Sequence, residues 1–153
     1  MTGMNYDLLA AQPFTAGLSE HQLRRLERIA LRSIFHAGNR LFHEGDPADR
    51  FWLIVDGRVD VDFPVADRDH LVVDTLGAGS VLGWSWLFPP YRWHFGAVAA
   101  ETSLTVQLDA ADVRELCDRD PKLGYELTQR ASQVLLQRLQ ATRQRLLTEF
   151  RRQ

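Results

Sequence analysis

The sequence predicts a mainly β fold with flanking helices, in the α+β class, and three observations support this prediction. Between residues 33 and 109, short apolar runs are separated by turn residues at intervals of roughly 8–12 residues, a pattern typical of β-sandwiches and β-barrels. Residues 1–32 contain a capped helical segment, and residues 110–153 carry an apolar stripe at helical spacing. With 153 residues in all, the three segments are expected to form one domain.

The predicted N-terminal helix begins at a capping box. Ser19 is followed by Gln22, a pair that satisfies the free backbone N–H groups at the start of a helix. Leu23, Leu26 and Ala30 then recur at helical spacing, so one face of this helix is expected to be buried.

The central segment contains the apolar runs that predict strands. They are residues 33–36, 40–43, 51–55, 59–63 and 71–75. The run at 59–63 alternates apolar and polar residues, as a half-buried strand does. Asp56-Gly57 predicts the tight turn of a hairpin, because glycine accepts the positive φ that such a turn requires.

The C-terminal segment predicts two helices. The first covers residues 110–120 and ends before Pro121, which suits the first turn of the next helix. The second covers residues 122–152, and at about 1.5 Å per residue a helix of about 30 residues is about 45 Å long. Its apolar stripe comprises Leu123, Leu127, Ala131, Val134, Leu135, Leu139, Leu146 and Phe150.

Such a helix outreaches a small β-domain, so part of the stripe is expected to pack on something else. One alternative is a helix lying on its own β-domain, and the other, which we favour, is the seam of a helix–helix homodimer. The predicted dimer interface comprises Leu127, Ala131, Val134, Leu135, Leu139 and Leu146.

Composition excludes several classes of protein. The net charge of −2 excludes a chain that is basic throughout, and a single cysteine, Cys117, excludes an internal disulfide and cysteine-based metal sites. The five histidines include no His-x-His pair, and hydrolase motifs and P-loops are absent, so we expect neither a metal site nor an enzyme. No apolar run is long enough for a membrane span and residues 1–7 lack signal-peptide character, so a cytoplasmic location is expected.

Three motifs carry a resemblance to a known family. They are His43-Glu44-Gly45-Asp46, residues 51–59 and the glycine-rich residues 76–83. In this order and spacing they resemble the cyclic nucleotide-binding domain of the catabolite activator and fumarate–nitrate regulator superfamily, over roughly residues 14–150. The resemblance implies an eight-strand, jelly-roll-like β-roll with a long C-terminal dimerisation helix.

The ligand loop departs from the family pattern. In the family, a Glu follows the glycine that Gly83 matches, an Arg that pairs with the cyclic phosphate comes some nine residues later, and a Thr follows. Here Trp84, Trp93 and Gly96 stand at those three positions. An indole carries no charge, so cyclic AMP or GMP is not expected to bind with useful affinity. The alternative is that a one-residue shift within the loop lets Arg92 replace the missing Arg.

Residues 83–95 therefore form a Trp-rich loop with two open interpretations. The indoles either plug the former ligand pocket or line a pocket for a flat or apolar ligand, with Ser85, Arg92 and His94 as polar anchors. The candidate ligand-binding residues are Gly83, Trp84, Ser85, Trp86, Arg92, Trp93 and His94.

We therefore expect a non-enzymatic, homodimeric regulatory or sensor domain that takes no required cofactor and responds to a small-molecule effector or a protein partner. The alternative is the ligand-sensing part of a transcription regulator of the same superfamily. Such regulators continue into a helix-turn-helix domain, and the sequence ends at Gln153 without one, so no DNA-binding domain is expected in this chain.

Overall fold

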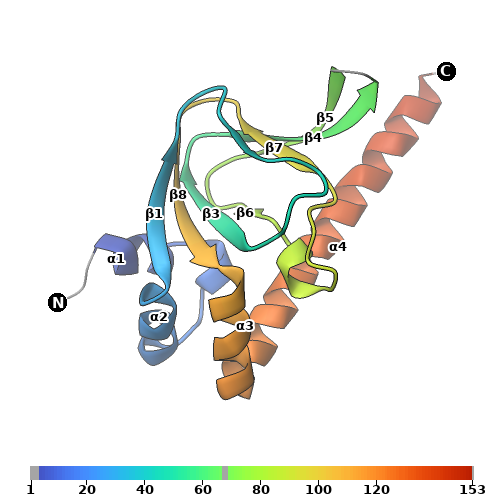
Figure 1. Ribbon diagram of the computed structural model, residues 1–153. Coiled ribbons are helices and arrows are strands. Elements are labelled where there is room, and N and C mark those ends of the chain that lie inside the picture. The colour runs from blue at the N-terminus through green and yellow to red at the C-terminus, as the bar shows by residue number, and fades with distance from the viewer. Residues whose placement is uncertain (1–3, 67–68, 153) are drawn as a thin grey trace.

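The structure, a computed structural model, describes residues 4–66 and 69–152. Eight strands form two four-stranded antiparallel sheets, with helices at one end and along one side (Figure 1). The first sheet has the order β1-β8-β3-β6 and the second the order β2-β7-β4-β5. The predicted β-roll with flanking helices is thereby confirmed.

The strands are short and carry the core on alternating residues. Their bounds are β1 Ala30–Phe35, β2 Arg40–Phe42, β3 Arg50–Asp56, β4 Val59–Ala66, β5 Asp69–Leu76, β6 Val81–Leu82, β7 Gly96–Ala99 and β8 Ser103–Asp109. Strand β3 is buried on both faces: Phe51 and Leu53 pack toward the helices, whereas Trp52 and Ile54 pack between the two sheets. This strand is therefore the wall between the two halves of the core.

The predicted hairpin at Asp56-Gly57 is corrected by the sheet topology. Gly57 has the expected positive φ of 106°, but β3 and β4 lie in different sheets and do not pair. A Cβ on Gly57 would lie 2.3 Å from Oγ of Ser103, so the turn passes too close to β8 for any side chain. The turn carries the chain from one sheet to the other, and β4 forms its hairpin with β5 instead.

Helices cover the outer face of the first sheet. They are α1 Met4–Ala10 and α2 Glu20–Glu27 before the strands, and α3 Ala110–Arg119 and α4 Pro121–Arg151 after them, with short 3-10 turns η1 Pro13–Thr15 and η2 Ser85–Leu87. The predicted capping box at Ser19 and Gln22 is present, with both of its hydrogen bonds. Helix α1 and η1 were not predicted from the sequence.

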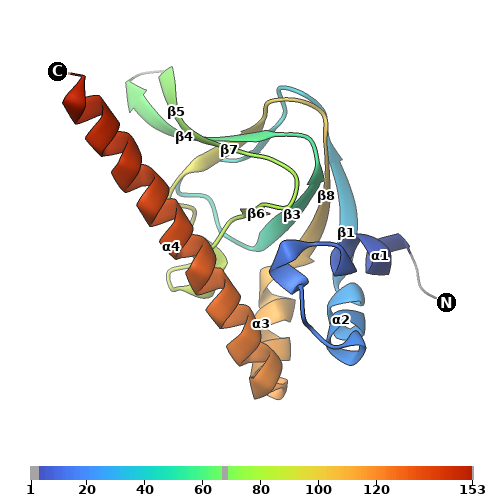
Figure 2. The same ribbon diagram turned by 180° about the vertical axis from the view of Figure 1, so that it is seen from behind.

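Helices α3 and α4 meet closely near Gly124. A Cβ at this position would lie 2.9 Å from the carbonyl oxygen of Cys117, so glycine allows the two helices to approach each other. Cys117 packs partly against the core, and its burial raises the pKa of the thiol, with a further contribution from nearby aspartates. From this contact, α4 runs along one side of the β-roll to the level of the β4–β5 hairpin (Figures 1 and 2).

The apolar stripe of α4 divides between two environments. Leu127 and Ala131 are buried in the core of their own chain and Val134 packs partly against it, so the predicted dimer contacts at these residues are revised to intramolecular ones. Leu135 is half-buried, whereas Leu139 and Leu146 are 65% and 67% exposed. The first half of the helix therefore lies on its own β-domain, and the second half leaves apolar side chains exposed.

Candidate ligand-binding site

The loop between β6 and β7 begins at a glycine that no other residue could replace. Gly83 has a φ of 103°, and a Cβ on it would lie 2.5 Å from Cη2 of Trp93. Both the backbone conformation and the space therefore require glycine. Gly83 was predicted to contact a ligand, and in the structure its neighbour is the indole of Trp93.

Trp93 occupies the interior of the β-roll. Its side chain is 3% exposed and stacks on Phe42 at a centroid distance of 4.0 Å, with Trp52 at 6.1 Å. An uncharged ring system therefore fills the position that the resemblance assigns to the phosphate-binding Arg. Its contacts are those of a core residue, with Phe95 also packed in the same cluster.

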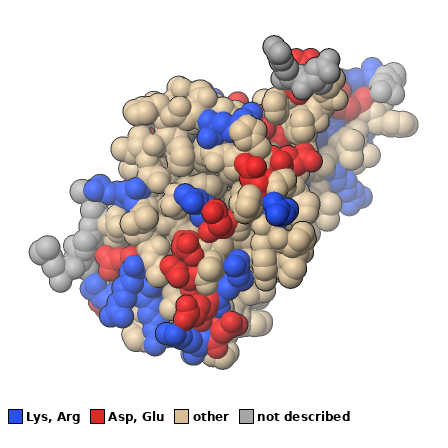
Figure 3. Space-filling view, in the orientation of Figure 1, with Lys and Arg blue, Asp and Glu red and all other residues tan. Residues whose placement is uncertain are grey.

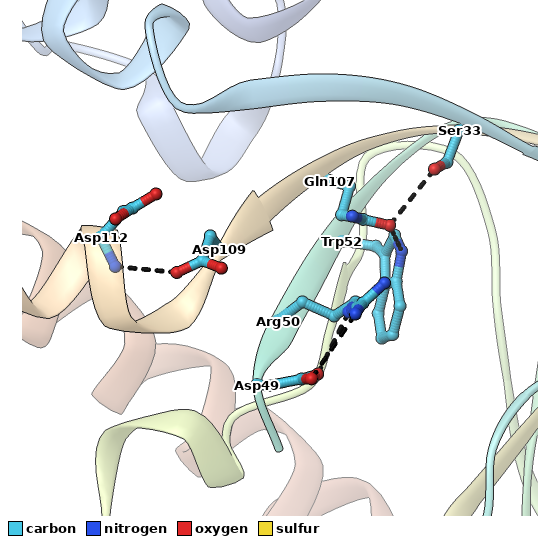
Figure 4. Close-up of polar contacts among 7 residues, drawn as sticks. All are labelled: Ser33, Asp49, Arg50, Trp52, Gln107, Asp109 and Asp112. Atoms are coloured by element: carbon cyan, nitrogen blue, oxygen red, sulfur yellow. Dashed lines mark hydrogen bonds and ion pairs between the residues drawn. The ribbon is translucent and has the colours of Figure 1, made fainter. Parts of the chain in front are cut away.

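Polar contacts fix the indole of Trp52, one member of the aromatic stack (Figure 4). Nε1 of Trp52 donates a hydrogen bond of 3.1 Å to Oε1 of Gln107, which also accepts one of 3.2 Å from Oγ of Ser33. Residues of β1, β3 and β8 are thus tied together, and the indole of Trp52 is held in one orientation beneath Phe42. Beside it, Arg50 pairs with Asp49 at 3.1 Å.

Trp86 anchors the same loop to the other half of the core. It is 1% exposed and stacks on Phe51 at 4.3 Å, while its Nε1 donates to the carbonyl oxygen of Gly83 at 3.2 Å. Nη1 of Arg114 on α3 donates to the carbonyl oxygen of Trp86 at 2.7 Å. Two of the three indoles of the loop are therefore structural anchors, one on each side of β3.

The third indole and its polar neighbours form the outer layer of the loop. Trp84 is half-buried and stacks on the exposed ring of His94, with centroids 5.5 Å apart and planes 11° apart. Nδ1 of His94 lies 3.1 Å from Oγ of the buried Ser85. Of the predicted ligand residues, Gly83 and Trp84 line a pocket beside α4, and Trp93 lines a separate one near Arg50.

Arg92 does not take the role of the missing Arg. Its guanidinium donates to the carbonyl oxygen of Gly45 at 3.0 Å, on the exposed side of the loop. An isolated bridge between Pro47 and Arg92 holds the backbone there, so the one-residue slip considered from the sequence is absent from this structure.

An ion pair occupies the third altered position. Arg40 on β2 contacts Asp62 on β4 through both of its terminal nitrogens, at 3.0 and 2.7 Å. This hydrogen bonding raises the pKa of Arg40. A Cβ on Gly96 would lie 2.5 Å from Oδ1 of Asp62, so the ion pair passes directly over the glycine that stands in place of the family's Thr.

A small apolar pocket lies between the loop, the β4–β5 hairpin and α4. Its volume is 130 Å³, and its polar lining residues are Asp74, Arg138 and Thr142. Arg138 pairs with Asp74 at 3.3 Å and donates to the carbonyl oxygen of Val81 at 2.8 Å. Burial lowers the pKa of Arg138, and the attraction of Asp74 partly offsets this effect. The apolar lining comprises Val61, Phe63, Val73, Leu76, Val81, Trp84 and Phe95.

The described residues 4–66 and 69–152 show neither a metal-binding cluster nor a membrane-spanning helix. Within them, no group of three or more His, Cys, Asp or Glu side chains is placed to hold a metal ion. No helix in that part of the chain is both long and apolar enough to cross a membrane.

The β-roll and the long C-terminal helix have the architecture of a cyclic nucleotide-binding β-roll domain. The sequence profile of the cyclic nucleotide-binding domain matches residues 32–120, and the chain belongs to this family. A solved candidate cyclic nucleotide-binding protein from Geobacter metallireducens GS-15 superposes with a TM-score of 0.79 and 26% identity, covering 91% of this chain and 99% of that one.

Curated relatives contain similar segments within longer proteins. Glutaminase 1 of Bradyrhizobium diazoefficiens is 28% identical over 132 residues, which is 86% of this chain and 21% of that enzyme. A CRP-like cAMP-activated global transcriptional regulator of Mycobacterium tuberculosis is 23% identical over 92% of this chain and 61% of the regulator. The chain thus spans between about a fifth and three fifths of these two relatives' lengths.

Proposed function

We propose that this domain is a non-enzymatic regulatory module that does not hold a cyclic nucleotide by its phosphate and that pairs with a second copy through α4. The observation that carries the first part is the burial of Trp93 at the phosphate-binding position. A buried phosphate needs charge-assisted hydrogen bonds, and an indole offers one neutral N–H donor.

The charges near the loop support the same proposal. Arg92 is bonded to Gly45 outside the pocket, Arg40 is committed to Asp62, and Arg138 is committed to Asp74. A cyclic phosphate entering beside Arg138 would have to compete with a carboxylate and would be repelled by it. The pocket of 130 Å³ is also smaller than the roughly 300–1,000 Å³ of drug-sized ligand sites.

The first test is a calorimetric titration of the full chain with cyclic AMP and cyclic GMP up to millimolar concentration. We expect no saturable heat and no change in melting temperature, because loss of a buried charged partner typically costs about 3–5 kcal/mol and moves a micromolar ligand to a millimolar one or weaker. A dissociation constant in the micromolar range for either nucleotide would contradict the proposal.

The exposed half of α4 supports the pairing with a second copy. Leu136, Leu139, Leu146 and Phe150 are 53%, 65%, 67% and 75% exposed. They follow the alternating spacing of three and four residues that coiled-coil seams use, with Arg143 completing the repeat. Successive helix residues turn by about 100°, so this seam lies far around the helix from Val134 and Arg138, which face the domain. A two-fold dimer would bury the same stripe on both copies.

Replacing Leu139 and Leu146 with Glu tests this seam. The double variant should sediment as a monomer at concentrations where the natural chain sediments as a dimer, because two carboxylates on each helix would be desolvated in the seam. Its circular dichroism should be unchanged, since both side chains are exposed within one chain. Gln144→Glu, on an exposed position away from the seam, is the matched control and should remain dimeric. A Leu139→Glu/Leu146→Glu variant that remains dimeric would disprove the seam.

A second candidate is the sensing part of a longer regulator. The match to the cAMP-activated transcriptional regulator, over 92% of this chain, favours it. On the face drawn in Figure 3, Lys and Arg side chains gather mainly at the lower left, and Asp and Glu side chains lie among and beside them. This mixture of charges does not favour contacts with DNA phosphates there. In this candidate, DNA contacts would come from another part of the protein.

A further inference from the structure

A pocket of 130 Å³ with a mostly apolar lining lies beside Trp84. It lies between three elements: the loop after β6 contributes Trp84, the β4–β5 hairpin contributes Phe63 and Val73, and α4 contributes Arg138 and Thr142. An occupant would therefore touch the β-roll and the long helix at the same time.

The lining of the pocket determines which chemistry fits. Most of its wall is aliphatic or aromatic, and the planes of Trp84 and Phe95, with centroids 5.8 Å apart, offer ring faces to a flat molecule. Its volume compares with that of an apolar cavity of about 150 Å³, which is known to hold a single benzene ring. One ring, or an aliphatic body of the same size, therefore fits, and a nucleotide does not.

The polar groups of the lining favour an uncharged occupant. Asp74 and Arg138 are the titratable groups that line the pocket, and they neutralise each other at 3.3 Å. An anion would meet the carboxylate of Asp74, and a cation would meet the guanidinium of Arg138. Thr142 adds a hydroxyl, for which the described residues provide no hydrogen-bond partner and which could serve a hydroxyl or carbonyl group of a ligand.

From this geometry we infer that the pocket binds a small neutral molecule with one ring and one hydrogen-bonding group, and that this molecule is the effector of the domain. The inference rests on the proposed function, because the effector role requires a regulatory domain whose phosphate position is closed. A ligand changes the position of α4 only if it binds two arrangements of the helix with different affinity, and contact with both Trp84 and Thr142 provides the means.

Benzyl alcohol and benzoate are matched probes, since they share a ring and differ in charge. Benzyl alcohol at ten times its dissociation constant should raise the melting temperature by about 3–6 °C, and benzoate at the same concentration should not. Methyl NMR should place the largest shift changes at Val73 and Val81. Absence of any response to benzyl alcohol, or a stronger response to benzoate, would overturn the inference.

Two substitutions on β5 locate the binding. Val73→Phe fills the pocket and should abolish the response, whereas Val72→Phe, on an exposed neighbour that does not line the pocket, should preserve it. An equal response from both variants would place the ligand elsewhere and refute the site.

A parallel titration with cyclic AMP separates the two proposals. A response to cyclic AMP would overturn the closed phosphate position. If the protein responds to neither cyclic AMP nor benzyl alcohol, the proposal of a closed phosphate position stands and only the inference of a neutral ligand is refuted.

Discussion

Trp93→Ala should lower the free energy of unfolding by about 3–5 kcal/mol, the usual cost of truncating a fully packed aromatic side chain. The substitution removes the ring that stacks on Phe42 at 4.0 Å and leaves the space beneath Gly83 empty. The surrounding rings cannot collapse into it freely, because Trp52 is tied to Gln107 by a hydrogen bond of 3.1 Å. Chemical denaturation monitored by circular dichroism measures the loss.

Trp84→Ala is the matched control from the same loop. Trp84 is half-buried and stacks on an exposed histidine, so truncation opens no closed cavity, and we expect a loss of less than about 1.5 kcal/mol. A loss for Trp84→Ala that equals or exceeds the loss for Trp93→Ala would show that the outer indole, rather than the inner one, closes the β-roll.

The fold could be predicted largely because its signals are local. The capping box at Ser19, the helix start at Pro121 and the turn glycine at position 57 each specify a backbone conformation within a few residues. Sheet membership could not be predicted in the same way. Asp56-Gly57 encodes a turn but not whether the strands on its two sides pair. Strand β3 pairs with β6 and β8, and β4 pairs with β5 and β7, so the pairing depends on residues far away in the sequence.

The candidate site, like the fold, could be predicted only where its signals are local in the sequence. The density of Trp residues between Gly83 and Phe95 identified the altered loop, and counting residues placed Trp93 at the phosphate position. Periodicity alone could not show that Trp86 and Trp93 turn inward while Trp84 lines a pocket, because an aromatic side chain fits either environment.

The residues that the sequence analysis missed come from distant elements. Arg138 and Thr142 lie on α4, where they look like ordinary polar residues beside an apolar stripe. Their spacing of four residues places them on one face of the helix, and this shared face was the sequence feature that could have linked them. The pairing of Arg40 with Asp62 left no local signal at all, since the two residues lie on different strands.

That ion pair yields the second large effect. Arg40→Met should destabilise the domain by about 3 kcal/mol, because it leaves the carboxylate of Asp62, whose side chain is 2% exposed, without its partner. The figure is at the low end of the usual 3–5 kcal/mol because the side chain of Arg40 is 23% exposed. Urea denaturation measures it, with Arg58→Met as the control: its pair with Glu101 is exposed on both sides and should contribute about 0–1 kcal/mol.

A double variant shows whether the loss comes from the unpaired charge. Arg40→Met combined with Asp62→Leu removes both charges and should recover most of the stability, since an apolar pair of similar volume often replaces a buried ion pair at little cost. The pKa of Arg40 is raised in the folded protein. Its contribution to the free energy of unfolding is therefore complete at every pH below the ordinary pKa of arginine, which lies far above neutral. The contribution is lost only as the pH rises past the folded-state pKa. The guanidinium is therefore charged throughout a comparison between about pH 6 and pH 9. A double variant as unstable as Arg40→Met alone would mean that the pair acts by positioning β2, β4 and Gly96 rather than by neutralising Asp62.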